Sequence, residues 1–394
     1  MQAFHCTPGT AMSPAPAQHV TAPVQDPFNG PSAAPRYATP IIAHLDMDCF
    51  FAQIEQKRRA ELAGLPVVVG ADPHHGHGRG VVCTANYEAR RFGIKSAMPI
   101  SKAYALCPAA MFLPVDYRHY SAVSRHIFSI AGAFCKTERT GIDEGYLDLG
   151  ACRDFEEGQS VAFDIKKAIL EKTGLTCSIG IAWNKRIAKI ASEMQKPDGL
   201  TVIRSHELEA KIWPLAADKM PGIGPHTKSR LERIGIKSIG QIAQSKPRFL
   251  AESLGAWGLG LYAAAWGSGS AELGGFWQPK SISRETTFGQ DTDDWVALRV
   301  TLDELSRRVH ADAVSENAFF RTVGVKVRFA NFETHTHART IKTTQALDRI
   351  KATVKALMQP ALESGRKIRL VGVRLSGLTD ATGQTRLEQF YSNP

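Results

Sequence analysis

Two pairs of acidic residues inside otherwise apolar, strand-like stretches constrain this chain more than any other feature. Asp46 and Asp48 directly follow the apolar run 41–45, and Asp143 and Glu144 lie in a second strand-like stretch. Ionised carboxylates are costly in an apolar setting unless a positive charge or hydrogen-bond donors compensate them. If the two stretches pair as neighbouring strands, three or four acids meet at one place. For Asp-Met-Asp alone, an ordinary strand-end or turn carboxylate remains the alternative interpretation.

Clustered carboxylates stay ionised when a cation lies between them, and their hard oxygen atoms suit Mg²⁺. Two such ions roughly 3.5–4 Å apart support in-line phosphoryl or nucleotidyl transfer. One ion activates the attacking 3′ oxygen, and the other holds the triphosphate and the leaving pyrophosphate. We therefore predict two Mg²⁺ ions as the cofactors of this chain.

Basic and hydroxyl side chains supply candidate phosphate ligands. Tyr87 and Arg90 lie three residues apart in a short helical pattern, so they share a face. A hydroxyl beside a guanidinium suits phosphate oxygens. A second predicted helix carries three further basic residues, Lys185, Arg186 and Lys189. For Lys185 and Arg186 we prefer the interpretation of an ordinary solvated face.

Hydrophobic patterning predicts an α+β protein of several domains. Residues 1–40 are rich in Pro, Ala, Thr and Gln and lack periodicity, which predicts a disordered leader. From there to about residue 205, strands alternate with helices, interrupted early by an insertion. Strands are predicted at 41–45, 65–70, 81–84, 137–149, 175–182 and 200–203, and helices from after Phe51 to about 63 and at 86–92, 116–134, 161–173 and 184–194.

The remainder of the chain changes in character. Residues 206–267 predict short helices with glycine turns, and 268–283 predict a linker. Gly222 and Gly224 fit a helix–hairpin–helix turn, in which backbone N–H groups approach a DNA phosphate, although an interhelical turn that merely needs glycine is the alternative. The final unit, from Ser283 to about 379, begins with a predicted strand, followed by further strands at 321–329, 338–343 and 367–375 and helices at 295–316 and 346–363.

Charge points to a polyanionic partner. The chain has 48 Lys and Arg against 38 Asp and Glu, a net charge of +10. This excess favours nucleic acid, although a generic basic protein fits equally well. In the final unit basic residues gather on or beside the predicted strands: Arg321, Lys326, Arg328, Arg339, Lys342, Arg366, Lys367 and Arg369.

Cysteine usage and hydropathy bear on the compartment. The seven cysteines are scattered without a CxxC pair, which argues against a disulfide framework or a structural zinc site. No apolar run reaches the ~18 residues that span a bilayer, and no signal peptide pattern opens the chain. We expect a cytoplasmic protein.

Several motifs, in one order, resemble a known family. They are Asp-Met-Asp-Cys-Phe-Phe at 46–51, Thr-Ala-Asn-Tyr-Glu-Ala-Arg at 84–90, Ile-Asp-Glu-Gly-Tyr-Leu-Asp at 142–148, Ala-Lys-Ile-Ala-Ser-Glu-Met at 188–194, Lys-Pro-Asp-Gly at 196–199 and Pro-Gly-Ile-Gly at 221–224. With them, residues 41 to about 379 resemble a Y-family translesion DNA polymerase of the DNA polymerase IV/kappa class. The resemblance implies template-directed addition of deoxynucleotides to a primer 3′ end, of low fidelity and distributive, in DNA damage tolerance.

The resemblance also implies an architecture like a right hand, with a ferredoxin-like palm, small fingers, a helical thumb and an α/β little finger. The expected boundaries are 41–64 and 116–205 for the palm, 65–115 for the fingers, 206–267 for the thumb, 268–283 for the linker, 284–379 for the little finger and 380–394 for a tail. Primer–template DNA and deoxynucleoside triphosphates are the implied partners of what we expect to be a monomer.

By position in these motifs, Asp46, Asp143 and Glu144 would be the metal ligands, assisted by the Met47 carbonyl. Asp48 would support them without binding metal. Phe51 would be the steric gate under the sugar, although a core phenylalanine is the alternative. The implied triphosphate ligands are Thr84, Tyr87, Arg90 and Lys189. The implied DNA-binding residues are Gly222, Gly224, Arg321, Lys326, Arg328, Arg339 and Lys342.

The chain departs from the family pattern at two glycines. Gly141 stands where Ser is usual, and Gly145 where Ala or Ser is usual. We expect them to loosen the strand without removing a ligand. Three histidines, His74, His75 and His77, lie in a Gly-rich stretch. A surface loop explains them better than a metal site, because a fourth ligand is missing.

The tail contains Gln384, Leu387, Phe390 and Tyr391, a spacing that resembles the peptide with which proteins dock on archaeal and eukaryotic sliding clamps. One helical turn would present the three apolar residues as a plug. Aromatics folded back onto the last domain are the alternative. For the whole chain, a catalytically silent DNA-binding recruitment factor and a nucleotidyl cyclase are the competing functions. The complete acid set argues against the first, and the helix–hairpin–helix turn and basic final unit argue against the second.

Overall fold

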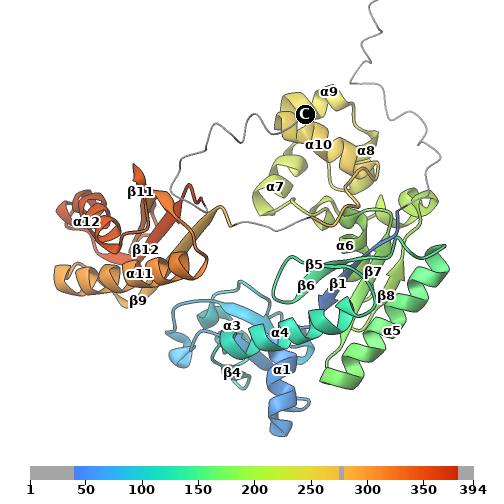
Figure 1. Cartoon of the computed structure of the whole chain (residues 1–394), viewed down its shortest axis with the longest axis horizontal. Coiled ribbons are helices and arrows are strands. Elements are labelled where there is room, and N and C mark those ends of the chain that lie inside the picture. Colours follow the sequence, from blue (N-terminus) through green and yellow to red (C-terminus); the bar gives the residue numbers. More distant parts are fainter. Residues whose placement is uncertain (1–39, 275–278, 380–394) are drawn as a thin grey trace, which may run out of the picture. The chain divides into compact units, whose positions relative to one another are not determined.

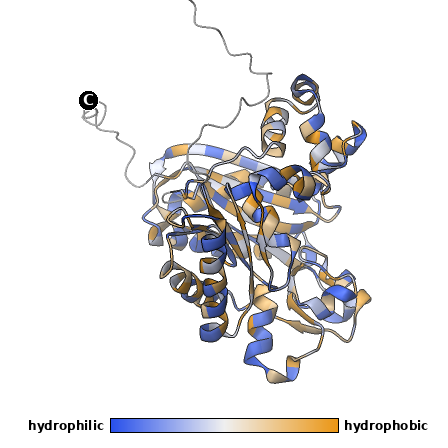
Figure 2. Cartoon of the chain, turned by 90° about the vertical axis from the view of Figure 1, so that its right-hand side faces the viewer, coloured by the Kyte–Doolittle hydropathy of each residue, from blue (hydrophilic) through white to orange (hydrophobic). Residues whose placement is uncertain are grey.

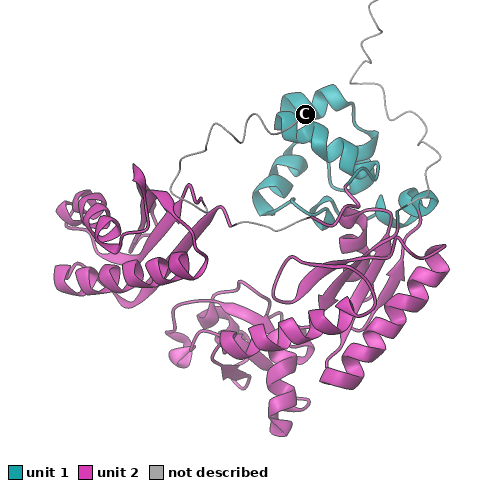
Figure 3. Cartoon of the chain, in the orientation of Figure 1, with its two compact units in different colours: residues 1–40, 205–269 teal, residues 41–204, 270–394 magenta. Residues whose placement is uncertain are grey.

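The computed structural model describes residues 40–274 and 279–379 and divides into two compact units (Figures 1 and 3). The described part of one unit is residues 205–269 with Pro40, and that of the other is 41–204, 270–274 and 279–379. The clamp-like peptide of the tail and nearly all of the leader lie outside the described residues. Helices alternate hydrophilic and hydrophobic residues along their length, as amphipathic helices do (Figure 2).

A five-stranded sheet carries both acid pairs, in the order β5-β6-β1-β7-β8. Its strands are β1 (Ile42–Met47), β5 (Thr137–Arg139), β6 (Glu144–Asp148), β7 (Cys177–Ala182) and β8 (Leu200–Val202). The single strand predicted at 137–149 is wrong, because the chain turns back between β5 and β6 and pairs them antiparallel. The two acid pairs therefore lie on directly paired strands.

Helices cover both faces of this sheet. They are α1 (Phe50–Arg58), α4 (Tyr117–Gly132), α5 (Phe155–Thr173) and α6 (Lys185–Met194). Side chains alternate along β1. Ala43 and Leu45 pack in the core with residues of α4 and α5, whereas His44 and Asp46 face the other side, where α6 packs. The sequence missed the first two turns of α5, whose true start is capped by the Asp154 side chain.

Close packing of α6 depends on a glycine in β7. A Cβ atom at Gly180 would lie 2.1 Å from the Ser192 nitrogen and 2.3 Å from the Ala188 carbonyl oxygen. Any side chain at Gly180 would push the helix off the sheet, since real Cβ contacts are never this short.

A three-stranded sheet, β3-β2-β4, occupies the segment inserted after α1. It consists of β2 (Val67–Gly70), β3 (Val82–Ala85) and β4 (Met111–Leu113), with helices α2 (Tyr87–Arg91) and α3 (Ile100–Leu106). Sequence patterning missed α3 and β4. The three histidines lie at a 3₁₀ turn, His74–Gly76, where the His74 N–H donates to Asp72 over 2.7 Å.

Near the C-terminus a four-stranded sheet has the order β11-β10-β12-β9. The strands are β9 (Ser281–Thr292), β10 (Phe320–Phe329), β11 (Thr334–Thr344) and β12 (Ile368–Ser376). Helices α11 (Trp295–Ser315) and α12 (Leu347–Glu363) bury one face with Val323, Val325 and Val327. The opposite face carries Thr322, Gly324 and Lys326. The predicted linker ends earlier than expected, since β9 begins at Ser281.

Residues 205–269 are helical. After short turns at Ser205–Glu207, Leu208–Ile212 and Ala217–Lys219 come α7 (Pro225–Arg233), α8 (Ile239–Gln244), α9 (Pro247–Leu254) and α10 (Ala256–Ala265). Gly222 has φ +96°, a conformation that favours glycine, and Gly224 is the N-cap of α7. The predicted glycine turn at Gly222 and Gly224 is therefore present. The 3₁₀ turn Ala217–Lys219 precedes it, where the sequence suggested a helix. No helix among residues 40–274 and 279–379 is long and apolar enough to cross a bilayer.

Candidate active site

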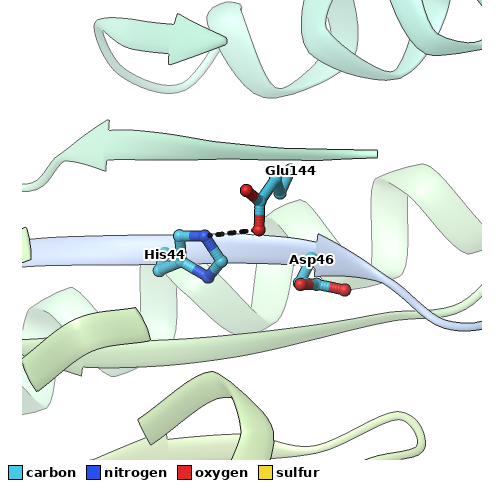
Figure 4. A group of neighbouring side chains, drawn as sticks. All are labelled: His44, Asp46 and Glu144. Atoms are coloured by element: carbon cyan, nitrogen blue, oxygen red, sulfur yellow. Dashed lines mark ion pairs between the residues drawn. The ribbon is translucent and has the colours of Figure 1, made fainter. Parts of the chain in front are cut away.

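Strand register brings the acids together. Asp46 on β1 pairs directly with Glu144 on β6, and the Met47 N–H donates to the Asp143 carbonyl over 2.9 Å. Asp46 and Glu144 therefore share one face of the sheet, together with His44 (Figure 4). Ligand atoms of these three residues lie within 4.8 Å of one another. The predicted meeting of acids from two strands is confirmed for this pair.

Two lysines compensate the acids. Lys196 Nζ lies 2.6 Å from Asp46 Oδ1 and also pairs with Glu193, and Lys189 pairs with Glu144. Burial raises the pKa of Asp46 to about 7, although Lys196 opposes the shift. His44 and Lys189 lower the pKa of Glu144 to about 2 against the effect of burial. Burial thus disfavours the ionised form of Asp46, whereas its neighbours keep Glu144 ionised, and positive charge close to both acids stabilises their ionised forms.

Burial also raises the pKa of the Asp143 carboxyl, and the neighbouring Glu144 adds to that rise. Among the described residues, the Asp143 carboxyl has no partner on another residue and accepts only from its own backbone N–H, and its backbone carbonyl is the group that contacts β1. Its carboxylate is thus available for a ligand.

Asp48 differs from the other acids. It is 1% exposed, and its carboxylate accepts hydrogen bonds from Ser178 Oγ (2.8 Å), Thr176 Oγ1 (2.9 Å) and the Asp198 N–H (2.8 Å). These donors join the ends of β1 and β7 to the turn that carries Lys196. Because they occupy its oxygens, Asp48 is suited to support rather than to bind metal.

The phosphate-ligand candidates partly assemble. The Arg90 guanidinium lies 4.8 Å from the centre of the Tyr87 ring, so this pair lies together as predicted. The Tyr87 hydroxyl is buried and has no hydrogen-bond partner among the described residues. Asn86, to which the sequence gave no role, accepts from the Val67 and Ala89 N–H groups at 2.9 Å each and fixes the start of α2. Thr84 is half-buried at the end of β3.

The expected solvated face at Lys185 is wrong. Its ammonium group pairs with Glu138 on β5 and lies 5.2 Å from the centre of the Tyr146 ring. The ion pair is only about a fifth exposed, because α6 packs against the sheet there.

Sequence reasoning missed two further neighbours. Lys196 belongs to the quoted Lys-Pro-Asp-Gly motif, which could have signalled a role. Tyr120 on α4 stacks on Phe51, with ring centres 4.4 Å apart and an interplanar angle of 19°. The Tyr120 hydroxyl donates to the buried Glu55 over 2.9 Å. Phe51 is therefore held against a fully buried ring and is partly exposed itself.

The expected DNA-binding residues of the last sheet do not all share a face. Paired residues of an antiparallel sheet point to the same side. Lys326 and Arg328 pair with Thr336 and Thr334 on the side away from the helices, where exposed Arg374, which the sequence did not single out, also lies. Arg339 pairs with core residue Val323 and so lies on the helix side. Arg321 and Lys342 are exposed where the β10–β11 register shifts.

Comparison with known proteins agrees with this architecture. Residues 45–193 match the impB/mucB/samB family, and residues 279–387 match its C-terminal domain. The chain is 43% identical over 355 residues to DNA polymerase IV of Methanoculleus marisnigri, covering 89% of this chain and 98% of that protein. It is 42% identical to DNA polymerase IV 2 of Methanosarcina mazei, covering 86% and 93%.

Solved structures show the same fold. A Y-family DNA polymerase chimera, Dbh-Dpo4(243-245)-Dbh, matches with a TM-score of 0.79 and 30% identity over 86% of this chain and all of that one. An insertion ternary complex of Dbh DNA polymerase matches with a TM-score of 0.58 and 30% identity, covering 85% and 98%. The chain belongs to the Y family of DNA polymerases, in the DNA polymerase IV class, and is a translesion enzyme that extends primer–template DNA with deoxynucleoside triphosphates in a metal-dependent reaction.

Proposed function

We propose that Asp46, Asp143 and Glu144 hold two Mg²⁺ ions, assisted by the Met47 carbonyl. The observation that carries this proposal is the pairing of Asp46 with Glu144 on adjacent strands, with Asp143 beside them. The donor set fits, because it consists of hard oxygen atoms at the end of a rigid sheet. Asp48 is left out because three donors already occupy its carboxylate.

Bound here, the ions would activate the primer 3′ oxygen and neutralise charge on the triphosphate. The chain's own residues bind and orient the nucleotide. Lys189 and Lys196, which now pair with Glu144 and Asp46, are placed to exchange these carboxylates for phosphate oxygens when cations arrive. Thr84, Tyr87 and Arg90 complete the proposed triphosphate site, in which the unpartnered Tyr87 hydroxyl gains an acceptor.

Phe51 is proposed as the steric gate. Its ring follows the acid motif at the start of α1, and the stack on Tyr120 limits how far it can retreat. A ribose 2′-hydroxyl would meet a ring that cannot move aside, so rejection would be steric.

DNA binding is proposed at two places. The Gly222–Gly224 turn offers backbone N–H groups and the N-terminus of α7 to a phosphate. In the last sheet the open face carries Lys326, Arg328 and Arg374, with Arg321 and Lys342 at its register shift. We do not retain Arg339, because it points to the helix side.

The three sheets support our proposed domain boundaries. We propose 41–64 and 116–205 as palm, 65–115 as fingers, 206–267 as thumb, 268–280 as linker and 281–379 as little finger. We further propose a cytoplasmic monomer, tethered to a sliding clamp of the archaeal and eukaryotic type by Gln384, Leu387, Phe390 and Tyr391. Tethering would raise the local enzyme concentration on DNA without changing the chemistry. Deleting 384–394 should leave short-primer extension intact and abolish stimulation by the cognate clamp.

The catalytic assignment is tested by Glu144→Gln, which keeps the shape and removes a charge. Extension should collapse while primer–template affinity persists, because binding depends on basic residues elsewhere. The matched control is Glu138→Gln, the same change on the same sheet outside the acid cluster, which should retain extension. Near-normal extension by the Glu144 variant would refute the assignment.

A further inference from the structure

One buried polar ring beside the acids has no part in the proposal above. His44 lies on β1, two residues before Asp46, and is 0% exposed. Figure 4 shows its ring over β1 and beside Glu144, with the contact to Glu144 dashed. A histidine at a fully buried position is costly unless its ring nitrogens have partners.

One ring nitrogen is anchored. The Ser192 hydroxyl on α6 has two acceptors within reach, His44 Nδ1 at 2.8 Å and the Lys189 carbonyl oxygen at 2.9 Å. When it donates to Nδ1, the ring proton lies on Nε2, which can then donate to Glu144. The anchor exists because Gly180, which pairs with His44 across β1 and β7, lets α6 approach the sheet. The Tyr146 ring, 4.9 Å away centre to centre, limits rotation on the other side.

The other ring nitrogen is directed at a proposed metal ligand. His44 Nε2 is 3.5 Å from Glu144 Oε2 and has no hydrogen-bond partner among the described residues. Lys189 contacts the same oxygen, Oε2. Both groups thus converge on one oxygen of Glu144 and leave Oε1 for another ligand. Long contacts of this kind tighten when a site is loaded.

We propose that His44 is a positioning residue for Glu144. Anchored by Ser192, the ring holds Glu144 Oε2 and so directs Oε1 toward the metal. The inference rests on the proposed role of Glu144 as a ligand. Partners that orient metal-binding carboxylates typically change metal affinity or activity by 10–100-fold when removed.

The test is a series at position 44 in the full chain: His44→Gln, His44→Asn and His44→Leu. A Gln amide reaches about as far as Nε2 and can donate to Glu144, whereas an Asn amide reaches only about as far as Nδ1. The measurements are the half-saturating Mg²⁺ concentration for primer extension and direct Mn²⁺ binding followed by electron paramagnetic resonance. Thermal unfolding identifies variants that fold.

We expect the Leu and Asn variants to raise the half-saturating metal concentration 10–100-fold. The Gln variant should remain close to the wild-type value. Ser192→Ala, which frees the ring, should shift it in the same direction by less. The control is Thr201→Val on β8, which alters another buried side chain of the same sheet, one without a hydrogen-bond partner among the described residues. It should leave the metal dependence unchanged.

Three results would overturn the positioning role. They are a wild-type metal dependence in folded His44→Leu, equal losses in the Gln and Asn variants, and a directly coordinated nitrogen in the Mn²⁺ spectrum, which would make His44 a ligand. If His44→Leu does not fold, the comparison of Gln with Asn decides. Glu144→Gln separates the two proposals. If this variant retains extension, the ligand assignment fails. If it loses extension while His44→Leu keeps the wild-type metal dependence, only the positioning role is overturned.

Discussion

Asp48 offers the sharpest test of how the acids divide their roles. Asp48 is 1% exposed, and Asp48→Ala would remove the acceptor of its three hydrogen bonds. Thr176 Oγ1 can turn to Gln53 Oε1, already 3.4 Å away, which leaves the Ser178 hydroxyl and the Asp198 N–H without partners. At about 1–3 kcal/mol for each stranded donor, the loss is about 2–6 kcal/mol.

Asp48→Asn keeps the shape and should cost less. The Asn carbonyl can accept from Asp198 and Thr176, and its amide can donate to Ser178 Oγ, which already accepts from the Gly199 N–H at 3.1 Å. What is lost is the charge assistance of the hydrogen bonds and the acceptor of the Ser178 hydroxyl proton, about 1–3 kcal/mol in total.

Hydrogen exchange at the amides of β7 and at Asp198 measures this effect locally, which suits a chain of several domains. Because Asp198 anchors the turn that carries Lys196, Asp48→Asn should raise the KM for nucleotide and keep extension within about tenfold. Asp46→Asn should abolish extension. If folded Asp48→Asn is as inactive as Asp46→Asn, Asp48 binds metal and our division of roles is wrong. Unchanged exchange protection in Asp48→Ala would refute the hydrogen-bond argument.

Four other outcomes can be measured. Phe51→Ala should raise ribonucleotide over deoxyribonucleotide incorporation, and an unchanged ratio in the folded variant would indicate a core side chain instead. Gly145→Ala should destabilise the palm sheet by about 1–3 kcal/mol, because its Cβ would lie 2.5 Å from Phe128 Cε1; unchanged exchange protection of β6 would contradict this. Burial raises the pKa of Asp46 from 3.8 to about 7, so the metal-free folded protein takes up a proton that the unfolded chain releases. The contribution of Asp46 to stability is therefore fully present below pH 3.8 and is lost as pH rises through about 7, and Asp46→Asn should remove this contribution in thermal unfolding scans. Arg374→Ala should weaken DNA binding and reduce the salt slope by about 1, whereas Arg339→Ala should change neither, and equal losses would show that the faces are misassigned.

The sequence determined which residues are candidates for the chemistry and in which kind of element most of them stand. The acids stand out in the sequence because they lie in or beside apolar, strand-like stretches. The strand pattern around Asp46 is strong because both faces of β1 are buried. Capping residues such as Asn86, Asp116 and Asn184 likewise fix the starts of their helices locally. Such features depend on neighbours in the chain and can be predicted from them.

Packing decided what the two unusual glycines do. We expected Gly141 and Gly145 to loosen the strand, but a Cβ at Gly145 would overlap both the Phe128 ring and the Glu138 carbonyl oxygen. The aromatic ring from α4 fills the space that a larger residue at 145 would take. Because Phe128 lies 17 residues before Gly145 in the sequence, no inspection of residues near 145 could have revealed this packing.

Tertiary structure alone decided which charged groups meet. The register between β1 and β6, two strands far apart in the chain, places Glu144 opposite Asp46, and a shift of one residue would turn it to the other face. The same rule separates Arg339 from Arg328, although both stand in predicted strands. Lys196 reaches Asp46 across 150 positions of sequence, because Asp48 holds the turn that carries it. Periodicity reports how residues alternate along one strand, whereas register between strands is set by turns and packing that lie far apart in the chain.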